Sequence, residues 1–483
     1  MNKLTYTYSG PLPLGSVVAH YCGAAGLTTC KEGPAWILKG DETANQYTLA
    51  VYYDGELQTT FSGSHTNEGR LQIGGQLLRL LRTHQGLAPL GDWGTLVGVR
   101  PTKLFHKLWD QLGSAEAAVN RLRKQYEVTE AKIALLEQVA TLQRPYVAPT
   151  DRADRLISVY GGIPFCQTHC TYCSFPYGLI QDYKRVSQFV EAFATDSEHL
   201  QTVLQDYDLQ LGTIYLGGGT PTSLNEADFE TVVAALAKLR EYGQSGADLE
   251  FTVEAGRPDS VTPYKLQTMA RWGVNRISIN PQSMQDSILK AIGRGHTAQA
   301  IKELYDYVRK HTSFQVNMDF IAGLPYQNET HMIENMDYVC QVMPENVTIH
   351  TLALKRGSPL YEGVGREAMP EEKAVQAMVA YCKERLEAAG YVPYYVYRQQ
   401  YMTSQTENIG YTLPGKVCEY NIRIMEERQS ILSVGPGSSS KWMRAPEYRQ
   451  LQQHMPKDVS VYIDTLSTLL DKRSQLCKQF WEG

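Results

Sequence analysis

Residues 156–173 read Leu156-Ile-Ser-Val-Tyr-Gly-Gly-Ile-Pro-Phe-Cys166-Gln-Thr-His-Cys170-Thr-Tyr-Cys173, an apolar run that leads into three closely spaced cysteines. The run is rich in apolar and β-branched residues and predicts a strand, with the CxxxCxxC spacing on the loop after it. Three thiolates can hold three irons of a four-iron cluster, since such clusters are normally bound by four cysteines. The fourth iron would then be open to a small chelating molecule. The loop therefore predicts a site where a reaction takes place, and not a site of electron storage.

A structural zinc site is the alternative use of these three cysteines. Zinc sites usually combine a CxxC pair with a second, distant pair of ligands. The other six cysteines are scattered along the chain and supply no such pair: Cys22, Cys30, Cys340, Cys382, Cys418 and Cys477. Scattered single thiols are typical of a reducing compartment. We therefore favour the cluster, and we predict a cytoplasmic protein that works at low oxygen.

Length and charge limit the classes of function that remain. The 483 residues suffice for two or three domains, and the net charge of -5 offers no basic field for nucleic acid. The N-terminal residues lack the apolar core of a signal peptide, and no run of roughly 18 apolar residues predicts a membrane span. We expect neither a nucleic-acid nor a membrane partner, and we expect a monomer.

Outward from the cysteine loop, apolar runs alternate with helical stretches, which predicts a parallel sheet. The six runs are residues 156–160, 213–216, 249–253, 276–279, 314–320 and 347–351. Six units predict an α/β fold with a partial (β/α)6 barrel at residues 151–360. An α+β N-terminal domain at 1–150 precedes it, ending in a proline-containing segment at 144–151. A mixed, substrate-covering C-terminal domain at 361–483 follows it.

Each predicted strand ends at a polar or glycine-rich feature. In parallel αβ barrels the loops beyond the carboxyl ends of the strands converge on one mouth, so these features predict a single site. Glycines let a backbone approach a ligand closely. After the cysteines, the features along the chain are Gly217-Gly-Gly-Thr-Pro221, Glu254, Gln282, Asp319, and His350 with Thr351.

Three charged residues at this mouth are candidates for ligand binding. Glu254 and Asp319 could bind a ligand amine or ribose hydroxyl, or each could form a buried salt bridge instead. Arg294 lies in Ile292-Gly-Arg-Gly-His296, which suits the presentation of a cation to a carboxylate. A solvated surface arginine is its alternative.

The segment from Tyr160 to Cys173, together with Gly217–Pro221, resembles the radical S-adenosylmethionine superfamily. Within it the chain is similar to the oxygen-independent coproporphyrinogen III oxidase (dehydrogenase) family, through the interval Gln282–Arg294 and the segment Val316–Pro325. Two further segments, Gly98–Lys103 and Pro393–Arg398, look like a long-form bacterial branch of that family with an N-terminal extension.

The resemblance implies a [4Fe–4S] cluster on Cys166, Cys170 and Cys173, with S-adenosylmethionine on the open iron. One electron, from a donor such as a flavodoxin or ferredoxin, would then produce a 5′-deoxyadenosyl radical. In the family this radical takes a hydrogen from a propionate of the tetrapyrrole substrate, and a vinyl group remains after carbon dioxide and an electron leave. Tyr160 and the cysteines would act in catalysis. The implied contacts with S-adenosylmethionine are Tyr160, Tyr172, Gly218, Gly219, Thr220, Glu254, Gln282, Arg294 and Asp319.

Phe175 departs from the oxidase pattern, which has a further cysteine two residues after the third. Phenylalanine there is shared with a sister branch that acts as a haem-carrying chaperone. Decarboxylation of coproporphyrinogen III to protoporphyrinogen IX is our first hypothesis, with a haem chaperone and a radical enzyme acting on haem as alternatives. His169 is a candidate haem contact.

Other residues could contact a tetrapyrrole. Lys355, Arg356 and Arg398 are candidate cations for propionates, and they equally fit a solvated loop. The tyrosine-rich segment 391–401 could form an apolar wall for the ring system, but a core strand is the favoured interpretation for most of its rings.

Overall fold

The computed structural model describes residues 4–30, 33–147, 154–175, 178–243, 249–363, 365–399, 406–445 and 448–483. The chain divides into two compact units, Met1–Gln138 with Arg398–Tyr401 and Val139–Tyr397 with Met402–Gly483. The three-domain division at residues 150 and 360 stays a prediction. Part of the proline-containing boundary segment lies outside the described residues. None of the described helices has the length and hydropathy that crossing a membrane requires.

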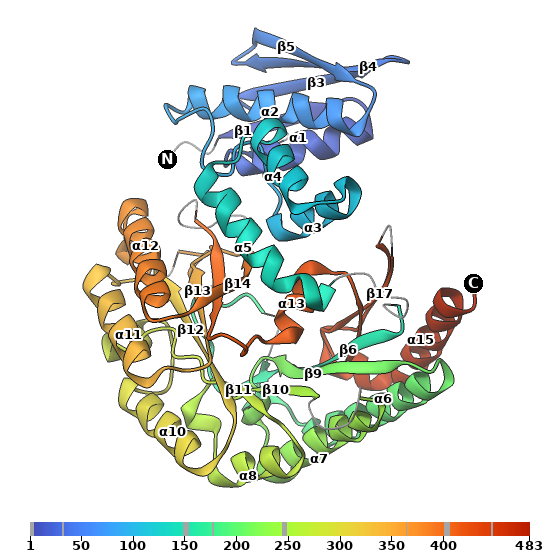
Figure 1. Cartoon of the computed structure of the whole chain (residues 1–483), viewed down its shortest axis with the longest axis vertical. Helices are drawn as coiled ribbons and strands as arrows, with labels where there is room; N and C mark the ends of the chain where they lie inside the picture. Colours follow the sequence, from blue (N-terminus) through green and yellow to red (C-terminus); the bar gives the residue numbers. More distant parts are fainter. Residues whose placement is uncertain are drawn as a thin grey trace. The chain divides into compact units, whose positions relative to one another are not determined.

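The N-terminal unit has an α+β structure (Figure 1). Its sheet has the order β2-β1-β3-β4-β5, with bounds β1 (Thr5–Ser9), β2 (Thr28–Thr29), β3 (Trp36–Glu42), β4 (Gln46–Tyr53) and β5 (Glu56–Ser64). Its helices are α1 (Leu12–Ala24), α2 (Asn67–His84), α3 (Pro101–Leu112), α4 (Ala115–Gln125) and the first half of α5 (Glu130–Val147). Residues 126–129 separate α4 from α5. Fully buried side chains such as Leu14, Leu49 and Leu77 form the core.

The second unit is built on six parallel strands, which confirms the predicted partial barrel. They lie in the order β6-β9-β10-β11-β12-β13, with bounds β6 (Leu156–Ile163), β9 (Gln210–Gly218), β10 (Glu250–Glu254), β11 (Arg276–Ser278), β12 (Gln315–Ala322) and β13 (Asn346–Thr351). Their apolar side chains are almost wholly buried, as expected of strands covered on both faces.

Helices flank the outside of this curved sheet (Figure 1). They are α6 (Val186–Asp206), α7 (Glu226–Ala237), α8 (Pro263–Arg271), α9 (Asp286–Ala291), α10 (Ala298–His311), α11 (Glu329–Val342) and α12 (Glu372–Ala388). Several begin at a side-chain cap, as in α10, where the Thr297 hydroxyl accepts from the Ala300 N–H at 3.2 Å. Each connection between successive parallel strands from β6 to β13 therefore contains a helix, as the predicted βα repeat requires.

Residues after 360 extend the same sheet to eleven strands. At one edge β15 (Asn408–Thr412) pairs antiparallel with β13, and β14 (Val392–Tyr397) pairs with β15. At the other edge β16 (Ser430–Val434) pairs parallel with β6, followed by β17 (Ser439–Arg444) and β18 (Arg449–His454). The remaining helices are α13 (Glu419–Glu426), α14 (Val459–Asp464) and α15 (Leu466–Trp481). In β14 both Tyr394 and Tyr395 are buried, which confirms the core-strand interpretation for those rings.

A carboxylate ties this C-terminal segment to the amino ends of the strands. Glu250, the first residue of β10, accepts from the backbone N–H groups of Glu419 at 2.8 Å and Tyr420 at 3.0 Å. These N–H groups begin helix α13, where an anion is stabilised by the helix dipole. The carboxyl ends of the strands are left for the site.

Candidate active site

The cysteine loop leaves β6 and is held by the segment around Gly293. The Thr171 N–H donates to the Ile292 carbonyl at 3.0 Å, and the Thr168 hydroxyl donates to the Gly293 carbonyl at 2.9 Å. Gly293 has φ +76°, and a Cβ there would lie 2.4 Å from the His169 carbonyl oxygen. Only glycine therefore permits this approach.

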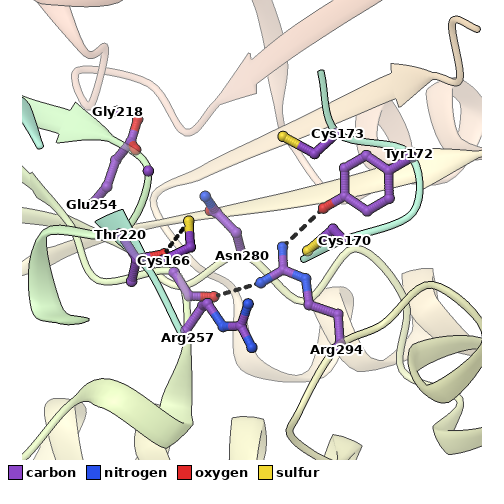
Figure 2. A pocket seen from close by; sticks show the side chains of 12 residues that line it. Cys166, Cys170, Tyr172, Cys173, Gly218, Thr220, Glu254, Arg257, Asn280 and Arg294 are labelled. Carbon is purple, nitrogen blue, oxygen red and sulfur yellow. Dashed lines mark hydrogen bonds between the residues drawn. The ribbon is translucent and has the colours of Figure 1, made fainter. Parts of the chain in front are cut away.

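All three cysteines line one cavity of about 100 Å³, shown in Figure 2. Cys166 and Cys170 are buried and Cys173 is partly exposed. The residues that share the cavity come from the last residues of β9 and β10 and from the segments that follow β6, β9, β10 and β11, as expected for the mouth of a parallel barrel. They are Tyr172, Gly218, Gly219, Thr220, Glu254, Gly256, Arg257, Asn280 and Arg294.

The glycines that end β9 form a cradle beside Cys166. Gly218 has φ +111°, in the region that favours glycine. A Cβ at Gly219 would lie 2.4 Å from the Phe165 carbonyl oxygen and 3.1 Å from Cys166 Sγ. Cys166 Sγ is itself 3.2 Å from the Thr220 hydroxyl. Backbone alone therefore faces the cavity at this point.

The residues fit an iron–sulfur cluster with a chelating ligand. The three thiols are suitable cluster ligands, and the cavity beside them contains polar atoms without a hydrogen-bond partner among the described residues, Asn280 Oδ1 and Arg294 Nε. No three His, Cys, Asp or Glu side chains within the described ranges are grouped to hold a single metal ion. Burial raises the pKa of Cys166 to about 12, so metal binding must displace its proton.

Tyr172 and Arg294 form one wall of the cavity, as Figure 2 shows. Arg294 donates to the Tyr172 hydroxyl at 3.1 Å and to the Gly256 carbonyl at 3.3 Å. Burial opposes the charged form of Arg294, but Tyr172 and Cys170 outweigh it and raise the pKa of the guanidinium. Arg294 therefore faces the cavity as a cation, not as the solvated arginine of the alternative.

Glu254 lies on the opposite side, at the end of β10. Its Oε1 accepts from the Tyr215 hydroxyl at 2.7 Å. Burial, assisted by the charge of Asp319, raises the pKa of Glu254 to about 7. No salt bridge with a Lys, Arg or His of the described ranges involves Glu254, so the structural alternative is not observed there.

Asp319, Gln282 and Tyr160 lie near this mouth but do not line the cavity. Burial opposes the ionisation of Asp319, but His350, 3.9 Å away, and Asn317 outweigh it and lower its pKa. Gln282 has φ +67°, and its Oε1 is buried without a partner among the described residues. Tyr160 stacks with Tyr215 at 6.2 Å between ring centroids.

The candidate tetrapyrrole contacts are spread more widely. His169, Lys355 and Arg356 are exposed. Arg398 belongs to the N-terminal unit, where it donates to the Leu96 carbonyl at 2.7 Å and its guanidinium lies over the Trp93 ring. The Phe175 N–H donates to Cys173 Sγ at 3.5 Å.

Sequence reasoning missed Arg257 and Asn280 in the cavity, and Tyr215 behind Glu254. Tyr215 alternates with buried apolar residues along β9, so period-two patterning would have placed it on the inner face. Arg257 follows Glu254 by three residues at a strand end, a weaker signal. Roles in binding for all of these residues remain predictions.

Several known proteins are similar to this chain. Residues 161–339 match the family described as the Radical SAM superfamily. The chain is 37% identical to the oxygen-independent coproporphyrinogen-III oxidase-like protein HemZ of Bacillus subtilis, over 84% of this chain and 80% of that protein. It is 28% identical to the heme chaperone HemW of Escherichia coli, over 59% of this chain and 70% of that protein. Among solved structures, it is similar to coproporphyrinogen III oxidase (HemN) from Escherichia coli, with a TM-score of 0.49, 19% identity, and coverage of 71% and 82%.

Proposed function

The chain belongs to the radical SAM superfamily, in the family of oxygen-independent coproporphyrinogen-III oxidase-like proteins, and from this we propose that it oxidatively decarboxylates coproporphyrinogen III to protoporphyrinogen IX. Its cofactors are those of the superfamily, a [4Fe–4S] cluster and S-adenosylmethionine. The observation that carries the proposal is the gathering of three cysteines, a glycine cradle and the ionisable side chains of Glu254, Arg257 and Arg294 on one cavity at the carboxyl ends of parallel strands.

Different residues of the chain would bind the cluster and S-adenosylmethionine. Cys166, Cys170 and Cys173 would hold the cluster, and the bound cofactors would supply a radical able to abstract hydrogen. Arg294 and the cradle at Gly218 and Gly219 would hold the charged end of S-adenosylmethionine.

Glu254 would accept hydrogen bonds from ribose hydroxyls, and the hydrogen bond from Tyr215 would fix its orientation. The Tyr160, Tyr215 and Tyr420 rings stack on one another, and Tyr215 donates to Glu254, so these rings would limit the access of water to the carboxyl. Exclusion of water there would protect a reactive radical from side reactions.

A second candidate is a haem chaperone, which Phe175 favours. The backbone N–H of Phe175 contacts Cys173 Sγ, and Phe175 is half-buried. The oxidase pattern has a cysteine at this position. A relative of this chain is named a heme chaperone. Both candidates use the same three cysteines, so the substrate must distinguish them.

An anaerobic turnover assay tests the proposal. Reconstituted, reduced protein is mixed with S-adenosylmethionine and coproporphyrinogen III, and the tetrapyrrole is followed by mass spectrometry. Successive losses of carbon dioxide with two hydrogens, together with 5′-deoxyadenosine, are expected. Deoxyadenosine without any change in the porphyrinogen would reject this substrate and direct the test to haem. Stoichiometric haem binding without consumption would favour the chaperone.

Cys170→Ala is expected to lose both the cluster and turnover, because it removes one of three iron ligands. Cys340→Ala is the matched control, since Cys340 is a partly exposed thiol on α11 that does not line the cavity. Iron content and product formation are measured for both variants. Full turnover by Cys170→Ala without a cluster would contradict the assignment.

Such an enzyme also needs an electron donor, for which we expect a flavodoxin or ferredoxin, and we expect it to act as a monomer. Reduction of the reconstituted cluster by each purified donor, followed by its visible absorption, tests the first expectation. Size-exclusion chromatography with light scattering tests the second.

A further inference from the structure

Arg257 is a buried cation in the candidate cavity with no assigned role. It is 3% exposed and lies on the loop after β10, three residues beyond Glu254. It lines the same cavity as the three cysteines, and Figure 2 shows it on the Cys166 side. A buried guanidinium needs compensating partners, since desolvating a charge is expensive.

Its first partner is the cysteine loop itself. Arg257 Nη2 donates to the Thr168 hydroxyl at 2.7 Å, and Nη1 donates to the Thr168 carbonyl at 3.4 Å. Thr168 lies midway between Cys166 and Cys170 in the sequence. Movement or loss of Arg257 would therefore be transmitted directly to the loop that carries the thiols.

Its second partner is Asp259. Arg257 Nη2 lies 3.2 Å from Asp259 Oδ2, and Nε lies 3.3 Å from Oδ1, a two-pronged contact with a carboxylate. Burial opposes the ionisation of Asp259, but His296 and Arg257 outweigh it and lower its pKa to about 2. Asp259 side-chain atoms remain a quarter exposed, so the anion meets solvent while the cation is enclosed.

The remaining charged and titratable groups around Arg257 define the local field. Arg294 is a second guanidinium on the cavity, and Glu254 is the carboxylate across from it. His296 lies 3.8 Å from Asp259, and burial lowers its pKa, which favours the neutral ring. Among the described residues that line the cavity, and apart from the cysteines themselves, two guanidinium groups therefore face one carboxyl group.

Reduction of a cluster adds one negative charge at the thiolates. A desolvated cation nearby stabilises the reduced form, and local charge and hydrogen bonds are among the factors that set cluster potentials. We propose that Arg257 is a positioning residue that raises the reduction potential of the cluster on the cysteine loop, with Asp259 as the counter-charge that limits the effect. This rests on the cluster of the proposed function and not on its substrate.

Reconstituted wild-type protein is compared with Arg257→Gln, Arg257→Lys and Asp259→Asn, without any tetrapyrrole. Iron per chain is measured first, and the midpoint potential is then found by redox titration followed by electron paramagnetic resonance. Arg257→Gln keeps hydrogen-bonding capacity but loses the charge. It is expected to shift the one-electron equilibrium about tenfold toward the oxidised cluster, a fall of ~59 mV.

The other two variants separate charge from structure. Arg257→Lys keeps the charge and is expected to stay nearer to the wild-type potential than Arg257→Gln. Asp259→Asn leaves the cation uncompensated and is expected to raise the potential. Arg257→Gln is thus expected to lower the midpoint potential and Asp259→Asn to raise it. A residue that only held the loop in place would not give shifts of opposite sign.

Unchanged potentials in fully loaded Arg257→Gln and Asp259→Asn would overturn the inference. Loss of iron in both Arg257 variants, with a wild-type potential in Asp259→Asn, would also overturn it in favour of a purely structural role. Because no porphyrinogen or haem is present, the result is independent of whether decarboxylation is observed.

Discussion

At the scale of single residues, Glu254 is a carboxyl whose surroundings favour its protonated form. The carboxyl is enclosed at the end of β10, beside Tyr215 and facing the charge of Asp319. Burial is the main cause of its raised pKa, and the Tyr215 hydrogen bond only partly offsets it. A group of this kind changes protonation near neutral pH.

Glu254→Gln tests this in the protein without S-adenosylmethionine. The folded-state pKa lies above the unfolded value, so the stability that Glu254 contributes is fully present below pH 4.5 and is lost as pH rises through about 7. Each pKa unit corresponds to ~1.4 kcal/mol, so the rise from 4.5 to about 7 sets an upper limit of roughly 3.4 kcal/mol. Screening by solvent in the cavity lowers the expected effect to about 2 kcal/mol. Glutamine cannot ionise, and it still accepts from Tyr215.

The measurement is the midpoint of urea unfolding at pH 5 and at pH 8. The variant is expected to match wild type more closely at pH 5 and to be relatively more stable at pH 8. An identical difference between the two proteins at both pH values would show that Glu254 titrates as an ordinary exposed carboxyl.

Residues differ in how well sequence alone predicts them. The three cysteines were predicted from their spacing, and the structure brings them to one cavity with Tyr172, Gly218, Gly219, Thr220, Glu254 and Arg294. Arg257 and Asn280 are isolated polar residues in loops, where neither spacing nor periodicity distinguishes a cavity-facing side chain from a solvated one. Only the fold brings their neighbours together.

At the scale of elements, the end of β9 and the start of the cysteine loop are mutually constrained. The Gly219 N–H donates to the Ile163 carbonyl at 2.7 Å, and the Thr220 N–H donates to the Phe165 carbonyl at 2.7 Å. This close pairing leaves no space for a Cβ at Gly219. The glycine therefore sets the position of Cys166 relative to the strand end.

Gly219→Ala is expected to destabilise the fold by about 1–3 kcal/mol, because its methyl group must displace the Phe165 carbonyl. It is also expected to lower iron content, since Cys166 follows Phe165. Gly23→Ala in α1 is the matched control, because a Cβ there meets no atom within 4 Å. Iron per chain and thermal midpoint are measured for both. Normal iron binding by Gly219→Ala would argue against the cradle.

Elements with strong local patterns were predicted best. The six strands of the partial barrel were predicted within a few residues, because each is a short apolar run between turns and helices. The place of β16 beside β6 was not predicted, although its run at residues 431–434 is apolar. Local sequence specifies a strand, whereas its neighbour in the sheet depends on contacts across more than 250 residues of chain.

At the scale of the whole chain, the second unit depends on its last residues to complete the sheet that carries the site. β16 lies next to β6, the strand that leads into the cysteine loop. Helix α15 packs against α6. Asp196 of α6 accepts from the Gly435 N–H at 3.0 Å and from the Tyr462 hydroxyl at 2.7 Å. Distant parts of the sequence therefore meet at one buried carboxylate.

Arg473 of α15 completes this junction. Its Nη2 lies 2.7 Å from Asp196 Oδ1 and donates to the Ser433 carbonyl at 2.8 Å, and both charged side chains are fully buried. Removing one partner leaves the other charge buried without compensation, which typically costs about 3–5 kcal/mol. Arg473→Met preserves much of the side-chain volume, so its expected loss of about 3–5 kcal/mol reports mainly the lost charge.

Arg385→Met is the matched control, because the Arg385–Asp337 pair has side chains that are 43% and 58% exposed. Exposed pairs of this kind contribute little, and a change below about 1 kcal/mol is expected. Urea unfolding compares the two variants, and iron content shows whether the weakened junction reaches the cysteine loop through β16 and β6. Equal stability losses in both variants would mean that the buried junction does not hold the sheet edge beside the site.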